Sequence, residues 1–165
     1  MTSVRPAGPA DVDAVTAVHE AARRAYYAAG GLDAGTPDPR RRETWQALVE
    51  GPHHSVWLIE RDRAVTGVLA AGRPVHPHPE GARVLELVGL YVDPAAWGAG
   101  TGRALHDTFT RALAAGPAVA GVLDVWNGND RALAFYRRRG WVPDGRSRPG
   151  GSGTAYLGLR LPSGR

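Results

Sequence analysis

Three glycines alternate with other residues in a short segment that follows an apolar stretch. They are Gly98, Gly100 and Gly102; the stretch 83–92 before them predicts a strand, and a helix is expected over roughly residues 98–115. Glycine lets the backbone turn tightly and approach a ligand closely. The first turn of the helix adds unpaired N–H groups and the positive end of its dipole. The segment is therefore suited to binding phosphate.

Two common phosphate-binding motifs do not fit this turn. A P-loop ends in Gly-Lys-Ser/Thr, and the 165 residues contain no lysine, because all 20 basic residues are arginine. A dinucleotide-binding turn would need its third glycine at position 103, which is Arg103, and no acidic residue follows at the expected distance. The glycines alone leave a second interpretation open, namely a flexible loop that binds nothing.

A second motif begins at Asn129, after a strand expected over residues 119–126. Residues 129–141 read Asn-Asp-Arg-Ala-Leu-Ala-Phe-Tyr-Arg-Arg-Arg-Gly-Trp. With the first motif, this segment resembles the GNAT superfamily of N-acetyltransferases. That family pairs a strand ending in Val-x-Pro, a glycine turn and a helix with a later N-x-x-A-x-x-F-Y-x-x-x-G-aromatic segment. Both motifs are present in the right order, and the similarity covers about residues 86–141.

The resemblance implies that the chain binds acetyl-CoA as a cosubstrate. The pyrophosphate would lie on backbone amides of the turn, and pantetheine would pair with the strand edge like an added strand, because it contains two peptide-like amides. The implied cofactor-binding residues are Leu90, Tyr91, Val92, Gly98, Ala99, Gly100, Thr101, Gly102, Arg103, Asn129 and Tyr136. One departure is Trp97, where the family often has arginine or glutamine. We expect the backbone amides to carry most of the binding.

The implied reaction is direct attack of an amine on the thioester. The amine must be neutral, and a lysine-like amine has a pKa near ~10.4, so a base or a desolvating site is needed. Tyr136 matches the family's usual general acid and could protonate the leaving thiolate. Its alternative role is that of an aromatic helix residue that packs on the sheet.

Two carboxylates are candidates for the base. Glu86 and Asp124 each interrupt an apolar strand run, 85–88 and 122–125. Burial of Glu86 would raise its pKa toward the useful range, whereas an outward-facing Glu86 would pair with an arginine. Asp124 matches a position that serves as base in some ribosomal-protein acetyltransferases that resemble this chain. We favour Glu86, and water remains a third alternative.

Composition restricts other chemistry. The chain has no cysteine, which excludes disulfides, thiolate metal sites and a cysteinyl intermediate. We expect no metal, because His76 and His78 lie in a proline-rich loop and are interpreted as exposed to solvent. The net charge of +4 could attract an anionic cofactor or nucleic acid. We disfavour nucleic acid, because the arginine content is typical of a GC-rich genome.

No apolar run approaches the roughly 20 residues of a membrane span, and the first residues lack the apolar core of a signal peptide. A cytoplasmic protein without a membrane partner is expected. The predicted elements are an edge strand at Val4, helices near 11–29, 39–50, 98–115 and 130–139, and strands near 56–59, 65–71, 83–92, 119–126, 141–142 and 155–161. The segment 145–153 between the last two strands is expected to be mobile.

This order predicts an α/β (α+β mixed) fold in a single domain of residues 1–165. We expect a GNAT-like central mixed, mostly antiparallel sheet of six to seven strands flanked by about four helices. The predicted function is transfer of an acetyl group from acetyl-CoA to a primary amine of a small molecule or peptide. Two alternatives are a toxin that acetylates aminoacyl-tRNA and a non-catalytic acyl-CoA sensor; a homodimer is left open.

Acceptor specificity is expected outside the two motifs, since the motifs handle only the cofactor. The first two helices offer aromatic walls and carboxylates for a cationic amine. The segment 145–153 could close over the acceptor or form a solvated hairpin turn. The residues singled out are Tyr26, Tyr27, Asp33, Asp38, Arg146 and Arg148.

Overall fold

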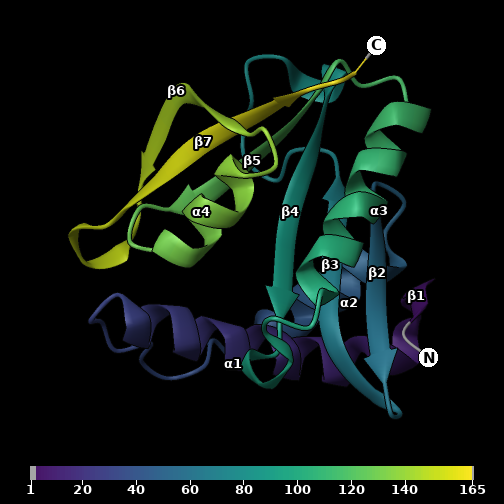
Figure 1. The fold of residues 1–165 in the computed structure, drawn as a ribbon, viewed down its shortest axis with the longest axis vertical. Helices are drawn as coiled ribbons and strands as arrows, with labels where there is room; N and C mark the ends of the chain where they lie inside the picture. The colour runs from purple at the N-terminus through teal and green to yellow at the C-terminus, as the bar shows by residue number, and fades with distance from the viewer. Residues whose placement is uncertain (1–2, 165) are drawn as a thin grey trace.

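The computed structural model describes residues 3–164, which form seven strands, four helices and four short 3-10 turns (Figure 1). The strands are β1 (Ser3–Pro6), β2 (His54–Arg61), β3 (Ala64–Gly72), β4 (Val84–Val92), β5 (Ala120–Trp126), β6 (Val142–Pro149) and β7 (Ala155–Pro162). The helices are α1 (Val12–Ala29), α2 (Arg41–Glu50), α3 (Thr101–Ala115) and α4 (Asp130–Arg137). The predicted mixed fold is confirmed.

One sheet contains all seven strands in the order β1-β2-β3-β4-β5-β7-β6. Every neighbouring pair is antiparallel except β4 and β5, which are parallel. These two strands pair only between Val84–Glu86 and Ala120–Val122. Beyond Glu86 they diverge (Figure 1), so the sheet has an open seam at its centre.

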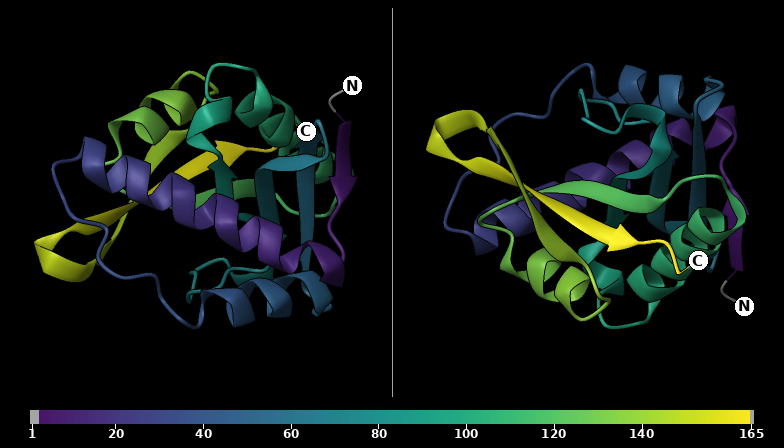
Figure 2. Two further views of the ribbon diagram at one scale, coloured as in Figure 1. Left: turned by 90° about the horizontal axis from the view of Figure 1, so that it is seen from below. Right: turned by 90° about the horizontal axis from the view of Figure 1, so that it is seen from above.

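Two helices cover each face of the sheet (Figure 2). On one face, Val12, Val15 and Val18 of α1 recur at helical spacing and pack with α2 against β2 and β3. On the other face, Leu105 and Phe109 of α3 are completely buried and share a core with α4. The apolar residues at helical spacing in α1 and α3 therefore hold both helices on the sheet.

A β-bulge in β4 sets which face of the sheet each of its side chains points to. Ala71 pairs with Leu87 and Ala70 with Gly89, so Val88 has no partner in β3. Leu87 packs in the α3–α4 core, while Val88 packs on the α1 side. Since side chains alternate along a strand, Glu86 points to the α1 side with Val88.

Two segments differ from the sequence-based prediction. Residues 145–149, expected to be mobile, belong to β6, which pairs with β7 in a hairpin. Its sequence does not resemble a strand because it is rich in proline and charged residues, which are common on edge strands. The second helix begins at Arg41 rather than at Pro39, because the Asp38 carboxylate accepts from the Arg40 N–H and forms a separate turn.

Within residues 3–164 there is no helix with the length and apolar content that a membrane crossing requires.

Candidate functional site

A cavity of about 640 Å³ occupies the open seam. The diverging strands β4 and β5 form its floor, the glycine turn and α4 close one end, and the C-terminal half of α1 borders the other. The predicted binding segments and two of the three predicted catalytic side chains, Tyr136 and Asp124, line this cavity. Glu86 is not among the lining residues.

The glycine turn presents a row of free amides to the cavity. Gly98 and Gly100 have φ angles of 80° and 83°, a conformation that strongly favours glycine. The first backbone bond of α3 runs from the Ala104 N–H to the Gly100 carbonyl. The N–H groups of residues 100–103 have no main-chain acceptor within the described chain. These amides and the helix dipole make the turn chemically suited to an anion.

The last residue of β4 offers its backbone to the seam. Asp93 donates its N–H to the Thr66 carbonyl of β3, so the Val92 carbonyl, at the other end of that planar peptide unit, points away from β3. The Trp97 indole donates Nε1–H to this carbonyl at 3.1 Å. By strand alternation, Leu90 presents its backbone to the same open edge, whereas the backbone of Tyr91 faces β3.

Asn129 and Tyr136 lie at the two ends of α4. The Asn129 side chain caps the helix, since its Oδ1 accepts from the Ala132 N–H at 3.1 Å. Tyr136 is only 7% exposed and packs edge-on against Trp141. Burial raises the pKa of the Tyr136 hydroxyl, which therefore stays protonated at neutral pH.

Glu86 is a buried carboxyl with one strong partner. It is 7% exposed, and its Oε2 accepts from the Val75 N–H at 2.6 Å. Burial raises its pKa, the Val75 hydrogen bond opposes this, and the nearby Asp124 carboxylate adds to the increase. The expected buried state is therefore present.

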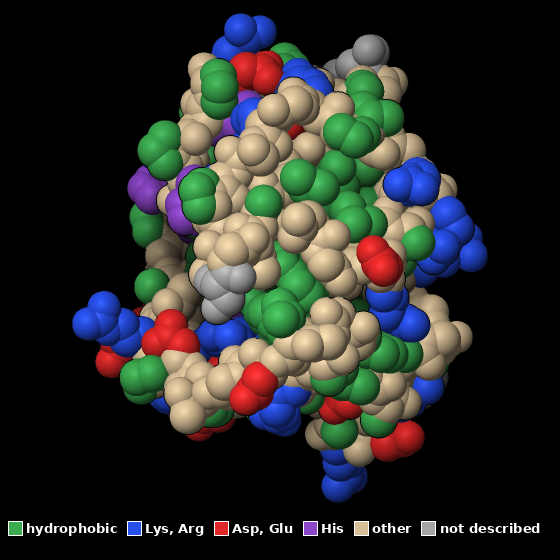
Figure 3. Space-filling view, turned by 90° about the vertical axis from the view of Figure 1, so that its left-hand side faces the viewer, with side chains coloured by type: hydrophobic (Ala, Val, Ile, Leu, Met, Phe, Trp, Pro, Cys, Tyr) green, Lys and Arg blue, Asp and Glu red, His purple; other side chains and the backbone are tan. Residues whose placement is uncertain are grey.

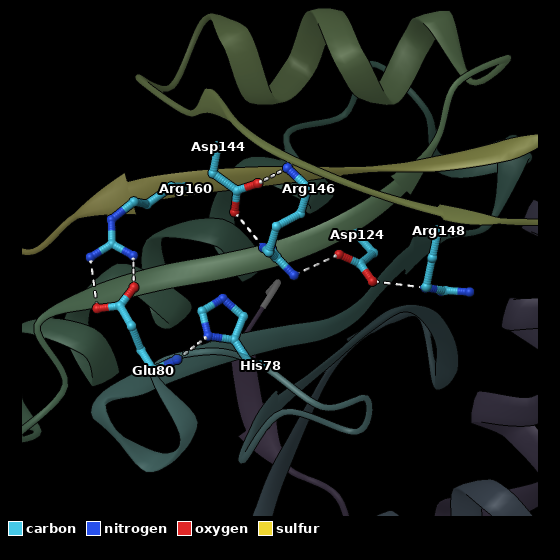
Figure 4. Close-up of polar contacts among 7 residues, drawn as sticks. All are labelled: His78, Glu80, Asp124, Asp144, Arg146, Arg148 and Arg160. Carbon is cyan, nitrogen blue, oxygen red and sulfur yellow. Dashed lines mark hydrogen bonds and ion pairs between the residues drawn. The ribbon is translucent and has the colours of Figure 1, made fainter.

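Asp124 projects to the same face of the sheet as Glu86, but it is held by arginines. Its Oδ2 accepts from Arg148 Nε at 2.8 Å, and its Oδ1 lies 3.4 Å from Arg146 Nη1. Arg146 also pairs with Asp144 at 2.8 Å, so β6 supplies both arginines and a second carboxylate (Figure 4). The arginine pairing considered for Glu86 is thus found at Asp124.

The family comparison agrees with this geometry. The Acetyltransferase (GNAT) family profile matches residues 15–141. The chain belongs to the GNAT family of acetyltransferases. No curated protein sequence matches the chain at a significant level.

Solved GNAT structures share the fold over nearly the whole chain. An N-acetyltransferase from Staphylococcus aureus Mu50 is 17% identical with a TM-score of 0.78, covering 99% of each chain. The ribosomal-protein-S18-alanine N-acetyltransferase from Escherichia coli is 17% identical with a TM-score of 0.75, covering 98% of this chain and 94% of its own. PaiA N-acetyltransferase from Thermoplasma acidophilum, in complex with coenzyme A, is 14% identical with a TM-score of 0.67, covering 96% and 98%.

The coenzyme A moiety of acetyl-CoA, the cosubstrate that the GNAT family implies, fits the residues at the turn. Besides the free amides, the Thr101 hydroxyl is buried at the start of α3 and has no hydrogen-bond partner among the described residues. Added Cβ atoms at Gly98 and Gly100 would meet no atom within 4 Å, so the space beside the turn is open. In residues 3–164, no group of three His, Asp or Glu side chains is placed to hold a metal ion.

The α1 end of the GNAT cavity is aromatic. Tyr26, Trp126 and Tyr156 line it, and Tyr27 stacks on Trp126 with 4.9 Å between ring centroids. The face toward which α1 and the β6–β7 hairpin project has hydrophobic side chains at its centre and arginines at its margins (Figure 3). Aromatic walls were predicted here, and Tyr26 provides one.

The carboxylates predicted for this end lie elsewhere. Asp33 accepts from the Gly35 N–H and Asp38 from the Arg40 N–H, so both stabilise local turns. Helix α2 contributes no lining residue, because its buried Trp45 and Leu48 pack in the core between α1 and the sheet.

The proline-rich loop also differs from its prediction. His76 is exposed as expected, but His78 is half-buried and its Nδ1 accepts from the Glu80 N–H at 3.1 Å. Glu80 in turn pairs with Arg160 of β7 (Figure 4). The Glu80–Arg160 ion pair thereby attaches the loop to β7.

Sequence reasoning missed Arg131 and Tyr156, which line the cavity, and the pairing of Arg148 with Asp124. Arg148 pairs with Asp124 and stacks on Tyr156, and Arg131 stacks on Trp97. Each contact joins residues of different elements, so no local pattern marks it. The one available signal was Trp97 itself, which departs from the residue types common at that GNAT position.

Proposed function

We propose that this GNAT protein transfers an acetyl group from acetyl-CoA to a primary amine of a small molecule or peptide by direct attack. The observation that carries the proposal is the open seam, which places an anion-binding turn at one end of a cavity and an aromatic compartment at the other. A donor and an acceptor can therefore meet between β4 and β5.

The donor would bind along the turn and the edge of β4. Backbone amides of residues 100–103 would hold the pyrophosphate. The Leu90 and Val92 backbone would pair with pantetheine like an added strand. Because Trp97 already donates to the Val92 carbonyl, the free Val92 N–H is the group available for this pairing.

Tyr136 would supply the proton for the leaving thiolate. It lines the cavity from α4, and its raised pKa keeps the proton on the hydroxyl until negative charge develops on the sulfur. No proton is lost to solvent beforehand, so the acid is ready at neutral pH.

Glu86 would take the proton from the acceptor amine. Its raised pKa makes it a stronger base than an ordinary carboxylate, whereas both Asp124 oxygens already face guanidinium groups. Since Asp124 rather than Glu86 lines the cavity, we propose that the proton reaches Glu86 through one bridging water.

The acceptor is proposed to be an amine that fits between Tyr26, Trp126 and Tyr156. The E. coli structural neighbour is named for acetylating an alanine of ribosomal protein S18, which makes peptide N-termini worth testing beside small amines.

The test is thiol release from acetyl-CoA across a panel of amines, peptides and charged tRNAs. The chain has no cysteine, so it adds no thiol background. We expect release with at least one small amine or peptide. Release only with charged tRNA would overturn the acceptor class. Tight acetyl-CoA binding without release from any acceptor would indicate a sensor instead.

A further inference from the structure

Trp97 connects the glycine turn to two other elements. The edge of its indole donates Nε1–H to the Val92 carbonyl at the end of β4, at 3.1 Å. The guanidinium of Arg131 stacks on the face of the indole, with its Cζ 4.1 Å from the ring centroid. Arg131 belongs to the first turn of α4, so this stack spans the mouth of the cavity from the turn after β4 to the helix after β5.

The Arg131 guanidinium is fixed in place but not neutralised. The side chain is exposed and forms no ion pair or hydrogen bond with the described residues. Asp130 precedes it, and adjacent helix residues do not face each other. Stacking on an aromatic ring attracts a cation to the ring face and leaves its N–H donors free.

The other arginines at this end of the cavity either contact another group already or have no aromatic ring to hold them. Arg103 lies 3.8 Å from Asp107, and Arg139 stacks on Phe135 and donates to its carbonyl. Arg138 is exposed and stacks on no ring within the described residues. Arg131 is therefore the cation that combines a fixed position on Trp97 with free donors.

We propose that Arg131, held on Trp97, is the side-chain cation that binds the pyrophosphate of the cosubstrate. It would be supplied from α4 in place of the arginine or glutamine that GNAT proteins often have at the position of Trp97. Guanidinium suits this task because two parallel N–H groups can contact two phosphate oxygens. This inference rests on the proposed use of acetyl-CoA.

The same contact would couple the two sides of the seam. Arg131 and Tyr136 are on one short helix, so a phosphate that binds both the turn and Arg131 would fix α4 relative to β4. Arg131 would then act as a positioning residue for Tyr136 as well as a binding residue for the donor.

The first test is calorimetry of coenzyme A binding to Arg131→Ala, with Arg137→Ala as the matched control. Arg137 is exposed on the same helix and does not line the cavity. Removing a charge-assisted contact typically costs about 10- to 100-fold in affinity. We expect that loss for Arg131→Ala, a smaller loss for Arg131→Lys and none for Arg137→Ala. Equal affinity of Arg131→Ala and the parent would overturn the proposal.

Shortened ligands identify the phosphate. With 3′-dephospho-coenzyme A, the parent and Arg131→Ala should still differ by the same factor. With pantetheine, which has no phosphate, the two proteins should bind equally. A difference that disappears with 3′-dephospho-coenzyme A would overturn the pyrophosphate assignment, because Arg131 would then contact the adenosine 3′-phosphate.

A double-mutant cycle tests the role of Trp97. In a Trp97→Ala background, adding Arg131→Ala should cost at least about threefold less affinity than in the parent, because the guanidinium is no longer held. Trp97→Gln should partly rescue Arg131→Ala by restoring a family-type side chain. Purely additive effects would contradict the shared role. A parent protein that fails to bind coenzyme A would instead refute the proposed function.

Discussion

Tyr136 and the two carboxylates approach the seam from opposite faces of the sheet. Tyr136 comes from the α3–α4 side, whereas Glu86 and Asp124 project toward α1. An acid and a base on opposite faces suit a reaction in which the leaving thiolate and the attacking amine are on opposite sides of one carbonyl. The assignment of roles follows from environment, because Glu86 is buried with a raised pKa and Asp124 is ion-paired.

Replacing Tyr136 with phenylalanine should lower turnover much more than cosubstrate affinity. The ring would still pack against Trp141, but the thiolate would lose its proton donor. We expect kcat to fall by about 100-fold or more, with the acetyl-CoA dissociation constant nearly unchanged. An unchanged kcat, in a variant whose chemical step limits the rate, would show that solvent protonates the thiolate.

Glu86→Gln should flatten the acidic limb of the pH–rate profile. The base must be deprotonated to accept a proton, so activity of the parent should rise with pH through the raised pKa of Glu86. The matched variant is Asp124→Asn. If Asp124→Asn flattens the limb and Glu86→Gln does not, the two roles are reversed.

Glu86→Gln also has a predicted effect on the free energy of unfolding. A carboxyl whose folded pKa exceeds its unfolded pKa binds more protons in the native state, so the unfolding free energy falls as pH rises through that window. Glu86→Gln removes this loss. The difference in unfolding free energy between variant and parent should therefore shift in favour of the variant from pH 4 to pH 8, measured by urea denaturation.

Among the elements, β6 departs most from what the sequence predicts. Its residues are rich in glycine, proline and arginine, and its strand character depends on pairing with β7, which no local pattern reveals. By contrast, α1 and α3 were predictable because their apolar residues repeat at helical spacing over several turns. The glycine turn was predictable because positive φ angles restrict the residue type. The Arg131–Trp97 and Arg148–Asp124 contacts were not, because tertiary structure alone joins them.

Arg148 of β6 is expected to affect the acceptor rather than the donor. It pairs with Asp124 and stacks on Tyr156 at 4.1 Å, and both partners line the cavity. Arg148→Ala should raise the acceptor KM severalfold while acetyl-CoA affinity is unchanged. Arg83→Ala, at an exposed 3-10 turn before β4, is the control. Parallel loss of donor and acceptor binding would mean that the hairpin supports the whole site.

At the scale of the whole molecule, the seam exists because two cores hold the sheet on either side of it. The strands β4 and β5 share hydrogen bonds at one end only, so packing of α3 and α4 on one face and of α1 and α2 on the other must keep their separated ends in place. Two histidines, the buried His106 and the half-buried His19, belong to this packing. His19 stacks on Tyr91 and accepts from Trp45 Nε1, and His106 accepts from Trp141 Nε1 at 2.9 Å.

These histidines predict a loss of stability in acid. Burial lowers the pKa of His19 to about 3 and that of His106 to about 4. The unfolded chain therefore binds protons first, and the unfolding free energy falls as pH decreases below ~6.5. At pH 5 each histidine should cost about 2 kcal/mol relative to pH 7.5. His19→Gln, which can still accept from Trp45, should lose about 2 kcal/mol less than the parent over this range. Equal losses in urea denaturation would contradict this.

The central claim is that acetyl-CoA binds on the glycine turn within the seam, and calorimetry of Gly100→Val tests it most directly. A side chain at Gly100 would enter the open space beside the free amides, where the pyrophosphate is proposed to lie. Gly35→Val is the matched control, since Gly35 also has a positive φ and open space but lies outside the cavity. With both variants folded by circular dichroism, we predict that Gly100→Val loses most of its affinity for acetyl-CoA and Gly35→Val binds as the parent does. Binding of acetyl-CoA to Gly100→Val as tight as to the parent would contradict the account.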